Sequence, residues 1–193
     1  MGTSDSEFES RHPDKEETMN FAKDILLIDF EGGRSRGPTQ IGAILLDKNT
    51  LEEKGSFVSY IWKDMRGTVG SKSGITQEML EGAPSEAEVG KMVFERFGTD
   101  VIIASFVADM DFRYFRQIIT AANLDPATYD YHVLDVWPLA YVHLLKKGYK
   151  GPITSEEIFQ EFGAKPRGNH NALEDCRITA DVLSKICFDK LEI

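Results

Sequence analysis

The first third of the chain alternates between apolar runs and short polar turns. Residues 24–31 form a nearly continuous apolar run that ends in acids, which is typical of a strand buried on both faces. Two more runs of strand character follow at residues 39–47 and 54–62, with a short polar turn between them. Three consecutive strands joined in this way predict an antiparallel meander.

Beyond residue 74 the apolar spacing becomes helical, and two short apolar runs interrupt it. These runs, at residues 100–104 and 131–134, predict further strands. Apolar faces at helical spacing predict helices at residues 75–80, 86–97, 109–122, 135–145, 154–162 and from 172 onward. A meander followed by strands that alternate with helices indicates an α/β protein with one mixed sheet flanked by helices.

Capping residues support these helix starts. The expected starts are Thr76, Ser85 with Glu88 as a capping box, Asp109 or Asp111, Asp135, Thr154 or Ser155, and Asn171. Asn171 places the start of the last helix at Ala172, so His170 lies on the loop before it and Asp175 about one turn inside. The positive end of the helix dipole keeps a nearby carboxylate ionised, which suits a metal ligand beside a general base. An ordinary capped helix with a surface histidine is the alternative for this stretch.

Composition limits the class of protein. The length of 193 residues is typical of one domain. Residues 1–20 are polar and rich in charge, which predicts a disordered arm ahead of a domain at residues 21–193. No apolar run reaches membrane-spanning length, so no membrane partner is expected. Cys176 and Cys187 lie about three turns apart on one predicted helix and are too distant to pair, which predicts reduced thiols in a cytoplasmic protein. The net charge of -10 argues against a general nucleic-acid coat protein, although bound cations can reverse the field locally.

Acidic residues stand at the ends of several predicted elements. Asp29 and Glu31 are two apart on a strand, so both side chains project from the same face. Asp111, or its neighbour Asp109, follows the fourth strand, and Asp175 lies in the last helix. Clustered carboxylates remain ionised around cations, and oxygen ligands favour Mg²⁺ or Mn²⁺ over zinc. Two such ions about 4 Å apart serve in-line phosphoryl displacement, and a histidine can take the proton from the attacking water.

This set of residues resembles the signature of a known enzyme family. Asp29-x-Glu31, Asp111 and His170-x4-Asp175 match the DEDD-type 3′→5′ exonucleases, in the variant with histidine in the third motif. The family contains the polymerase proofreading subunit, ribonuclease T and oligoribonuclease. The resemblance runs from about residue 24 to residue 183 and includes the stretches QIGA at residues 40–43 and GITQEMLEGAP at residues 74–84.

The resemblance implies a ribonuclease H-like fold with two divalent metal ions, and release of nucleoside 5′-monophosphates from a 3′ end. By motif position it assigns the metal carboxylates to Asp29, Glu31, Asp111 and Asp175, and the general base to His170. Asp109 is the rival for the third acid. Asp111 is preferred because the run from Asp111 to Phe115 fits the acid-then-apolar pattern of the family better.

Two departures affect substrate choice. The family often has small hydroxyl residues where this chain has Gly32 and Gly33, and a His-Asn pair where it has Phe106 and Val107. Both places contact the terminal nucleotide in relatives. The candidate substrate contacts are Phe30, Gly32, Arg34 and Arg36. A core position for Phe30 and a solvated loop for the two arginines are the alternatives.

The sequence therefore predicts a metal-dependent 3′→5′ exonuclease acting on the 3′ end of single-stranded or short DNA or RNA. Hydrolysis of dinucleotides or other small phosphodiesters is one alternative, because the acidic net charge repels long polyanions. A non-catalytic nucleic-acid-binding module on the same fold is another, although such a module has no physical need for clustered carboxylates. The sequence leaves a homodimer possible.

Overall fold

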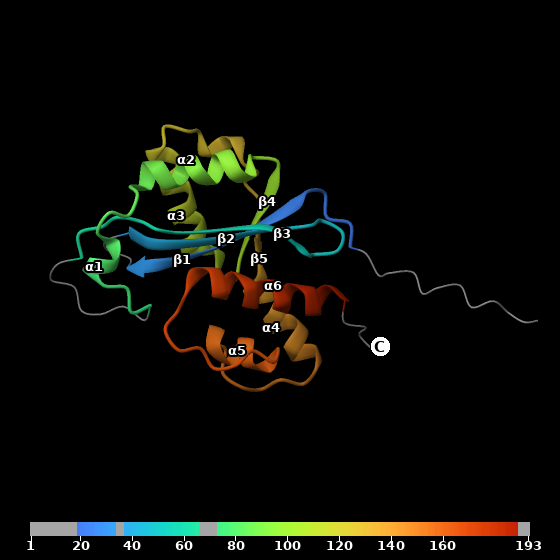
Figure 1. Cartoon of the computed structure of the whole chain (residues 1–193). Coiled ribbons are helices and arrows are strands. Elements are labelled where there is room, and N and C mark those ends of the chain that lie inside the picture. Colours follow the sequence, from blue (N-terminus) through green and yellow to red (C-terminus); the bar gives the residue numbers. More distant parts are fainter. Residues whose placement is uncertain (1–18, 34–36, 66–72, 189–193) are drawn as a thin grey trace, which may run out of the picture.

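The computed structural model describes residues 19–33, 37–65 and 73–188. Its centre is a five-stranded sheet in the order β3-β2-β1-β4-β5. The strands are β1 Asp24–Gly33, β2 Gly37–Leu46, β3 Glu53–Tyr60, β4 Val101–Ser105 and β5 Val133–Asp135. β2 runs antiparallel to β1 and β3, whereas β4 runs parallel to β1 and β5. The predicted meander and the mixed sheet are therefore confirmed, and β1 is the central strand (Figure 1).

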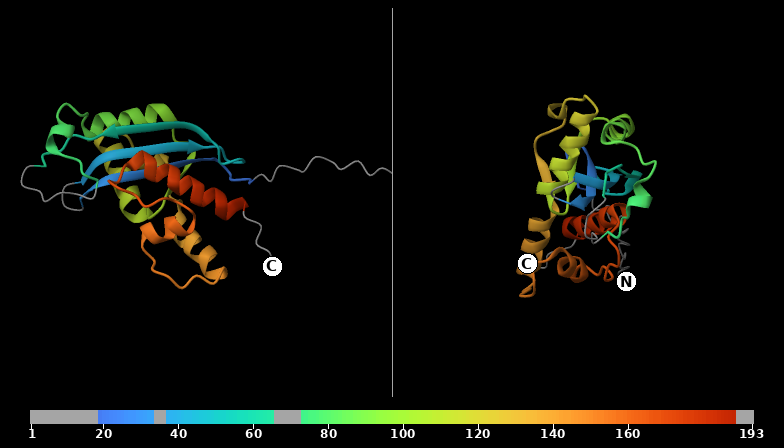
Figure 2. Two further views of the ribbon diagram at one scale, coloured as in Figure 1. Left: turned by 60° about the horizontal axis from the view of Figure 1, so that its bottom comes forward. Right: turned by 90° about the vertical axis from the view of Figure 1, so that its left-hand side faces the viewer.

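Helices cover both faces of this sheet. They are α1 Gln77–Leu80, α2 Glu86–Phe97, α3 Ala108–Ala121, α4 Val136–Lys146, α5 Ser155–Glu161 and α6 Ala172–Phe188, with a short 3-10 turn η1 Pro126–Thr128. α2 and α3 lie on one face, and α6 lies on the other with α4 and α5 beneath it (Figures 1 and 2). No helix among the described residues combines the length and apolar character needed to cross a bilayer.

Alternate residues of β1 feed two separate apolar cores. Ile25 and Leu27 pack in the core shared with α4, α5 and α6, whereas Leu26 and Ile28 pack in the core shared with α2 and α3. Because side chains alternate along a strand, Asp29 continues the row of Ile25 and Leu27. Its carboxylate is therefore directed to the α6 face, where the apolar core ends.

Most predicted helix starts are confirmed. Ser85 and Glu88 form both hydrogen bonds of a capping box at α2. Thr76 caps α1 and Asp135 caps α4. Of the two candidates at α5, Thr154 is the cap, since its side chain accepts from the Glu157 N–H.

The start of α3 corrects the prediction. Its N-cap is Val107, which makes no side-chain cap bond, and both Asp109 and Asp111 lie in the first turn. The helix begins at Ala108, so neither acid occupies the capping position. The Asp111 carboxylate instead accepts hydrogen bonds from residues of β1 and β4. The fifth strand is also displaced from its predicted place: it spans Val133–Asp135, and Tyr131 is an exposed residue before it.

The N-terminal arm predicted at residues 1–20 lies outside the described residues, except for Met19 and Asn20. The Met19 N–H donates to the Asn49 carbonyl, at the turn between β2 and β3. Both cysteines are free, as expected for two residues about three turns apart on one helix. Cys176 is buried between α6 and the sheet.

Candidate metal centre and active site

A cavity of about 190 Å³ lies where the carboxyl end of β1 meets α3, α5 and the beginning of α6. Its lining residues are Asp29, Phe30, Glu31, Phe106, Val107, Asp111, Ser155, Phe159, Arg167, His170 and Asp175. The structure thus brings together all the residues that the sequence assigned to the metal centre and the general base. They come from segments more than 140 positions apart in the chain, from Asp29 to Asp175.

Asp111 and Asp109 are separated by their surroundings. Asp111 Oδ1 accepts from the Phe30 N–H at 3.1 Å, and Oδ2 accepts from the Ser105 hydroxyl. These bonds join α3 to β1 and β4 and direct the Asp111 carboxylate into the cavity. Asp109 points away: its side chain is 84% exposed and pairs with Arg113 one turn along the helix. Asp111 therefore lies in the cavity lining, and Asp109 lies outside it.

Two residues of β2 seat the beginning of α6 against the sheet. The buried Gln40 side chain accepts from the Ala172 N–H at 3.1 Å. Gly42 lies opposite Asp29 in β2, and a Cβ there would be 2.3 Å from the Ala172 carbonyl carbon. Only glycine allows the helix to approach this closely. Gln40 and Gly42, both in the QIGA stretch, therefore hold the start of α6 close to β2 and so bring Asp175 near the acids of β1.

Asn171 and His170 complete the entry into α6. The Asn171 side chain accepts from the Leu173 and Glu174 N–H groups, at 3.2 Å each, as a helix cap does. His170 Nδ1 lies 3.8 Å from Glu31 Oε1 and 3.7 Å from Asp175 Oδ2. One ligand atom from each of these three residues falls within 4.8 Å of the others, a spacing that can surround one metal ion.

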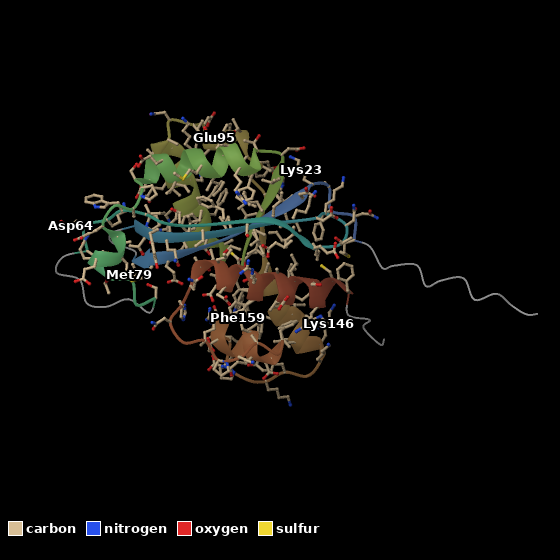
Figure 3. All side chains as sticks on the ribbon, viewed as in Figure 1. Lys23, Asp64, Met79, Glu95, Lys146 and Phe159 are labelled. Carbon is tan, nitrogen blue, oxygen red and sulfur yellow. The ribbon has the colours of Figure 1, made fainter. Side chains whose placement is uncertain are left out.

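Arg167 is the residue of this cavity that the sequence analysis missed. Its Nη1 donates to Asp175 Oδ2 at 2.7 Å, and its Nε donates to Glu156 Oε2 at 2.8 Å. The guanidinium also lies 4.8 Å from the centre of the ring of Phe159, a residue of α5 that is labelled in Figure 3. Its position three residues before His170 was the only available signal, because the loop pattern does not tell which side chains turn inward.

Burial of these acids at close range raises their pKa values. Burial, followed by the charges of Asp111, Asp175 and Glu31, raises the pKa of Asp29 well above its usual range. Burial and the Asp175 charge raise the pKa of Glu31 to about 7. Burial also raises the pKa of Asp111 to about 7, although the bonds from Ser105 and Phe30 oppose it. The positive charge of Arg167 lowers the pKa of Asp29, Glu31 and Asp175, but not enough to offset burial for any of them.

One oxygen in the cluster lacks a partner. Asp29 Oδ2 is buried, and no described residue donates a hydrogen bond to it. A buried carboxylate oxygen without a donor is unfavourable unless the group binds a cation or takes up a proton. The carboxylate donor set of Asp29, Glu31, Asp111 and Asp175 therefore fits a hard divalent cation such as Mg²⁺ or Mn²⁺.

The candidate substrate contacts have different surroundings. The Phe30 ring is 8% exposed and packs edge-on against Tyr114 with ring centres 5.9 Å apart, so most of it belongs to the core. Gly32 lies at a bulge beside β2, and a Cβ there would be 2.4 Å from the Gly37 carbonyl oxygen. Arg34 and Arg36 fall outside the described residues.

A wider groove of about 1100 Å³ adjoins the cavity. Four residues line both spaces: Val107, Ser155, Arg167 and His170. The far wall of the groove includes Trp137 and the exposed Ile153, and the Trp137 indole N–H donates to the Ile153 carbonyl at 3.1 Å. The acidic cavity is therefore continuous with a partly apolar approach.

Comparison with known proteins gives a family match over most of the chain. The model of the exonuclease family that is named for ribonuclease T matches residues 27–183. The DNA polymerase III subunit epsilon of Aquifex aeolicus is 26% identical over 151 residues, which cover 76% of this chain and 69% of that protein. The matched residues contain every acid of the cavity and His170.

Solved structures share the fold at low sequence identity. E. coli Exonuclease I in complex with a dT13 oligonucleotide has a TM-score of 0.69 at 18% identity, over 85% of this chain and 41% of that chain. The nuclease domain of 3'hExo, a DEDDh family member bound to rAMP, has a TM-score of 0.63 at 20% identity, over 90% of this chain and 96% of that chain. The ribonuclease H-like architecture predicted from the sequence is thereby confirmed.

Proposed function

The chain belongs to the exonuclease family whose model it matches, and on this premise we propose that it is a metal-dependent 3′→5′ exonuclease of the DEDD type with histidine in the third motif. The proposed reaction releases nucleoside 5′-monophosphates from the 3′ end of single-stranded or short DNA or RNA. The observation that carries the proposal is the convergence of Asp29, Glu31, Asp111, Asp175 and His170 on one small cavity.

Asp29, Glu31, Asp111 and Asp175 would hold two Mg²⁺ or Mn²⁺ ions. Such a pair of ions supplies charge neutralisation for the phosphoryl group that is attacked and for the oxygen that leaves. The protein contributes a preformed set of oxygens, because Asp111 is fixed by Ser105 and Phe30 and Asp175 is fixed by Arg167. The unpartnered Asp29 Oδ2 supports a ligand role for this residue.

His170 would accept the proton of the attacking water. Histidine titrates near neutral pH and so can both take and release a proton there. The Glu31 and Asp175 oxygens near its Nδ1 would stabilise the imidazolium that forms. The loop position of His170, ahead of the rigid α6, lets the ring face an incoming phosphodiester.

The groove beside the cavity would receive the nucleotides that precede the scissile bond. Bases of single strands stack on apolar and aromatic side chains without regard to sequence, and Trp137 provides such a surface. The net charge of -10 disfavours long polyanions, which supports short strands and keeps dinucleotides as a second candidate substrate. Among the structural neighbours, E. coli Exonuclease I binds a dT13 oligonucleotide, which is DNA, and the 3'hExo nuclease domain binds rAMP, which is a ribonucleotide.

A time course on 5′-labelled DNA and RNA oligomers, with and without Mn²⁺, tests the proposal. We expect a ladder that shortens from the 3′ end only when metal is present. Asp111→Asn should abolish the ladder, while Asp109→Asn, two residues away and exposed, should leave it unchanged. His170→Ala should slow the ladder by about 10²–10⁴-fold, the usual contribution of a general base. Shortening without metal, or equal cleavage by the Asp111→Asn protein, would refute the assignment, and faster cleavage of a dinucleotide than of any longer strand would favour the second substrate.

A further inference from the structure

Arg167 links two helices across the back of the cavity. It comes from the loop between α5 and α6, and its guanidinium bonds to one acid on each helix. Nε donates to Glu156 Oε2 at 2.8 Å near the start of α5, and Nη1 donates to Asp175 Oδ2 at 2.7 Å in the first turn of α6. The two bonds form a continuous chain from Glu156 through Arg167 to Asp175.

The guanidinium is held on several sides. The Arg167 backbone N–H donates to Glu156 Oε1 at 3.1 Å, so Glu156 holds both the main chain and the side chain of Arg167. Gln160, one turn further along α5, donates to the same Glu156 oxygen. The Phe159 ring lies under the guanidinium, and the Arg167 side chain is only 11% exposed. A side chain held in this way loses little further freedom when a ligand arrives.

Arg167 engages one oxygen of the Asp175 carboxylate, Oδ2. This contact restrains the position of Oδ2 while leaving Oδ1 unused by the guanidinium. Carboxylates that bind metals are commonly oriented by hydrogen bonds from a second layer of side chains. The hydrogen bond from Arg167 to Asp175 has this form.

We propose that Arg167, tethered by Glu156, is a positioning residue that holds Asp175 in the orientation needed to bind a divalent metal ion. The inference rests on the metal centre proposed above. It assigns a purpose to Glu156 and to α5, neither of which belongs to the acid motifs of the chain. It also assigns to Arg167 a role that its charge alone does not suggest.

Positioning and simple charge compensation predict opposite results. If Arg167 only supplied a positive charge to the acid cluster, it would compete with the metal, and its removal would tighten metal binding. If it orients Asp175, its removal weakens metal binding even though a competing cation has gone. The sign of the change in Mn²⁺ affinity therefore separates the two roles.

The experiment is a calorimetric titration of Mn²⁺ into the 193-residue protein without substrate, at one pH and ionic strength. Arg167→Met, which keeps an apolar stem over Phe159, should bind Mn²⁺ about 10–100-fold more weakly than the parent. Arg167→Lys should recover only part of this loss, because an ammonium group does not span Glu156 and Asp175 as a guanidinium does. Glu156→Gln keeps Arg167 and its bond to Asp175, so it should show a smaller loss in the same direction and stay testable if Arg167→Met does not fold.

Arg177→Met is the matched control. Arg177 lies on α6 and, like Arg167, pairs with an acid, Glu53, but this pair is exposed and neither residue lines the cavity. Its Mn²⁺ affinity should stay within about twofold of the parent, as expected for a surface ion pair.

The outcomes are distinct. Unchanged or tighter Mn²⁺ binding by Arg167→Met would overturn the positioning role. Unchanged Mn²⁺ binding with a raised KM would also overturn it, by showing that Arg167 contacts the substrate instead. Absence of Mn²⁺ binding by the parent protein would overturn the metal centre itself, and this inference with it.

Discussion

The two ends of β1 carry the same kind of residue in opposite circumstances. At the beginning of the strand, Asp24 Oδ1 accepts from the Lys48 N–H at 3.1 Å and Oδ2 pairs with Lys54 Nζ at 2.7 Å. Toward the other end, five residues along the strand, Asp29 Oδ2 is buried without a donor among the described residues, and other acids surround it. Both oxygens of Asp24 have a partner, as is usual for a charged group near the surface. The surroundings of Asp29 instead support its proposed role as a metal ligand.

The contrast arises from what packs against each end. The Lys54 side chain on β3 and the Lys48 backbone N–H in the preceding turn contact Asp24, whereas Gly42 and Gln40 let α6 pack closely against the sheet beside Asp29. The close approach of α6 excludes water and adds the Asp175 charge. The same packing that completes the fold at this end therefore creates an unfavourable cluster of acids, which is typical of functional sites.

The largest expected effect comes from neutralising each end in turn. Asp29→Asn should lower the exonuclease rate by at least about 10²–10³-fold, because an amide replaces a proposed metal ligand. The same change should raise the melting temperature of the metal-free protein, because it removes a carboxyl group whose ionisation is opposed by burial and by the neighbouring acids. Asp24→Asn should do the reverse, with an unchanged rate and a slightly lower melting temperature. Initial rates and thermal melts in EDTA measure both quantities, and matching behaviour of the two variants would remove the contrast.

A smaller effect is expected from Gly42→Ala. A Cβ at this position meets the Ala172 main chain at 2.3 Å, so α6 must move away from β2 and carry Asp175 with it. We expect a loss of about 1–3 kcal/mol in the free energy of unfolding, as for other overpacked sites, together with weaker Mn²⁺ binding. Gly55→Ala in β3 is the control, because a Cβ there has no neighbour within 4 Å. Urea unfolding that shows Gly42→Ala to be as stable as Gly55→Ala would contradict this packing.

The smallest effect is a pH dependence in the metal-free protein. Burial raises the folded-state pKa of Glu31 to about 7, above its value of 4.5 in an unfolded chain. Below the unfolded value Glu31 is protonated in both states, so its charge has no effect on stability. Between pH 4.5 and about 7 the unfolded chain ionises more readily, and stability falls as pH rises.

Glu31→Gln isolates this contribution. Its melting temperature in EDTA should equal that of the parent near pH 4 and exceed it above pH 7, since glutamine has no charge to bury. Mg²⁺ should reduce the gap by stabilising the parent at high pH. A constant difference between the two proteins from pH 4 to pH 8 would show that Glu31 is not destabilised by its surroundings.

Sequence reasoning predicted the parts of this site that depend on local rules. Strand alternation placed Asp29 and Glu31 on one face, and the Asn171 cap fixed the start of α6 at Ala172. These inferences succeeded because each depends only on neighbours in the chain. The choice between Asp109 and Asp111 stayed open in the pattern itself, because both acids lie in the first turn of α3 and only bonds from Ser105 and Phe30 distinguish them.

The other contacts of the site become visible only in the three-dimensional structure. The bridge from Glu156 through Arg167 to Asp175 joins residues of a helix, a loop and a second helix, and no spacing rule connects them. The start of α3 was wrong in the prediction because Val107, a residue with no capping group, occupies the capping position. The contacts of Arg34 and Arg36, the homodimer and the cytoplasmic location stay predictions.

The central claim is that the acids at the end of β1 form a binding site for divalent cations, and a calorimetric Mn²⁺ titration tests it most directly. The parent protein and Asp24→Asn should bind Mn²⁺ with the same affinity and a stoichiometry of two ions per chain, as two-metal sites do. Asp29→Asn should lose at least one of the two. Equal Mn²⁺ binding by all three proteins, or none by the parent, would contradict the account.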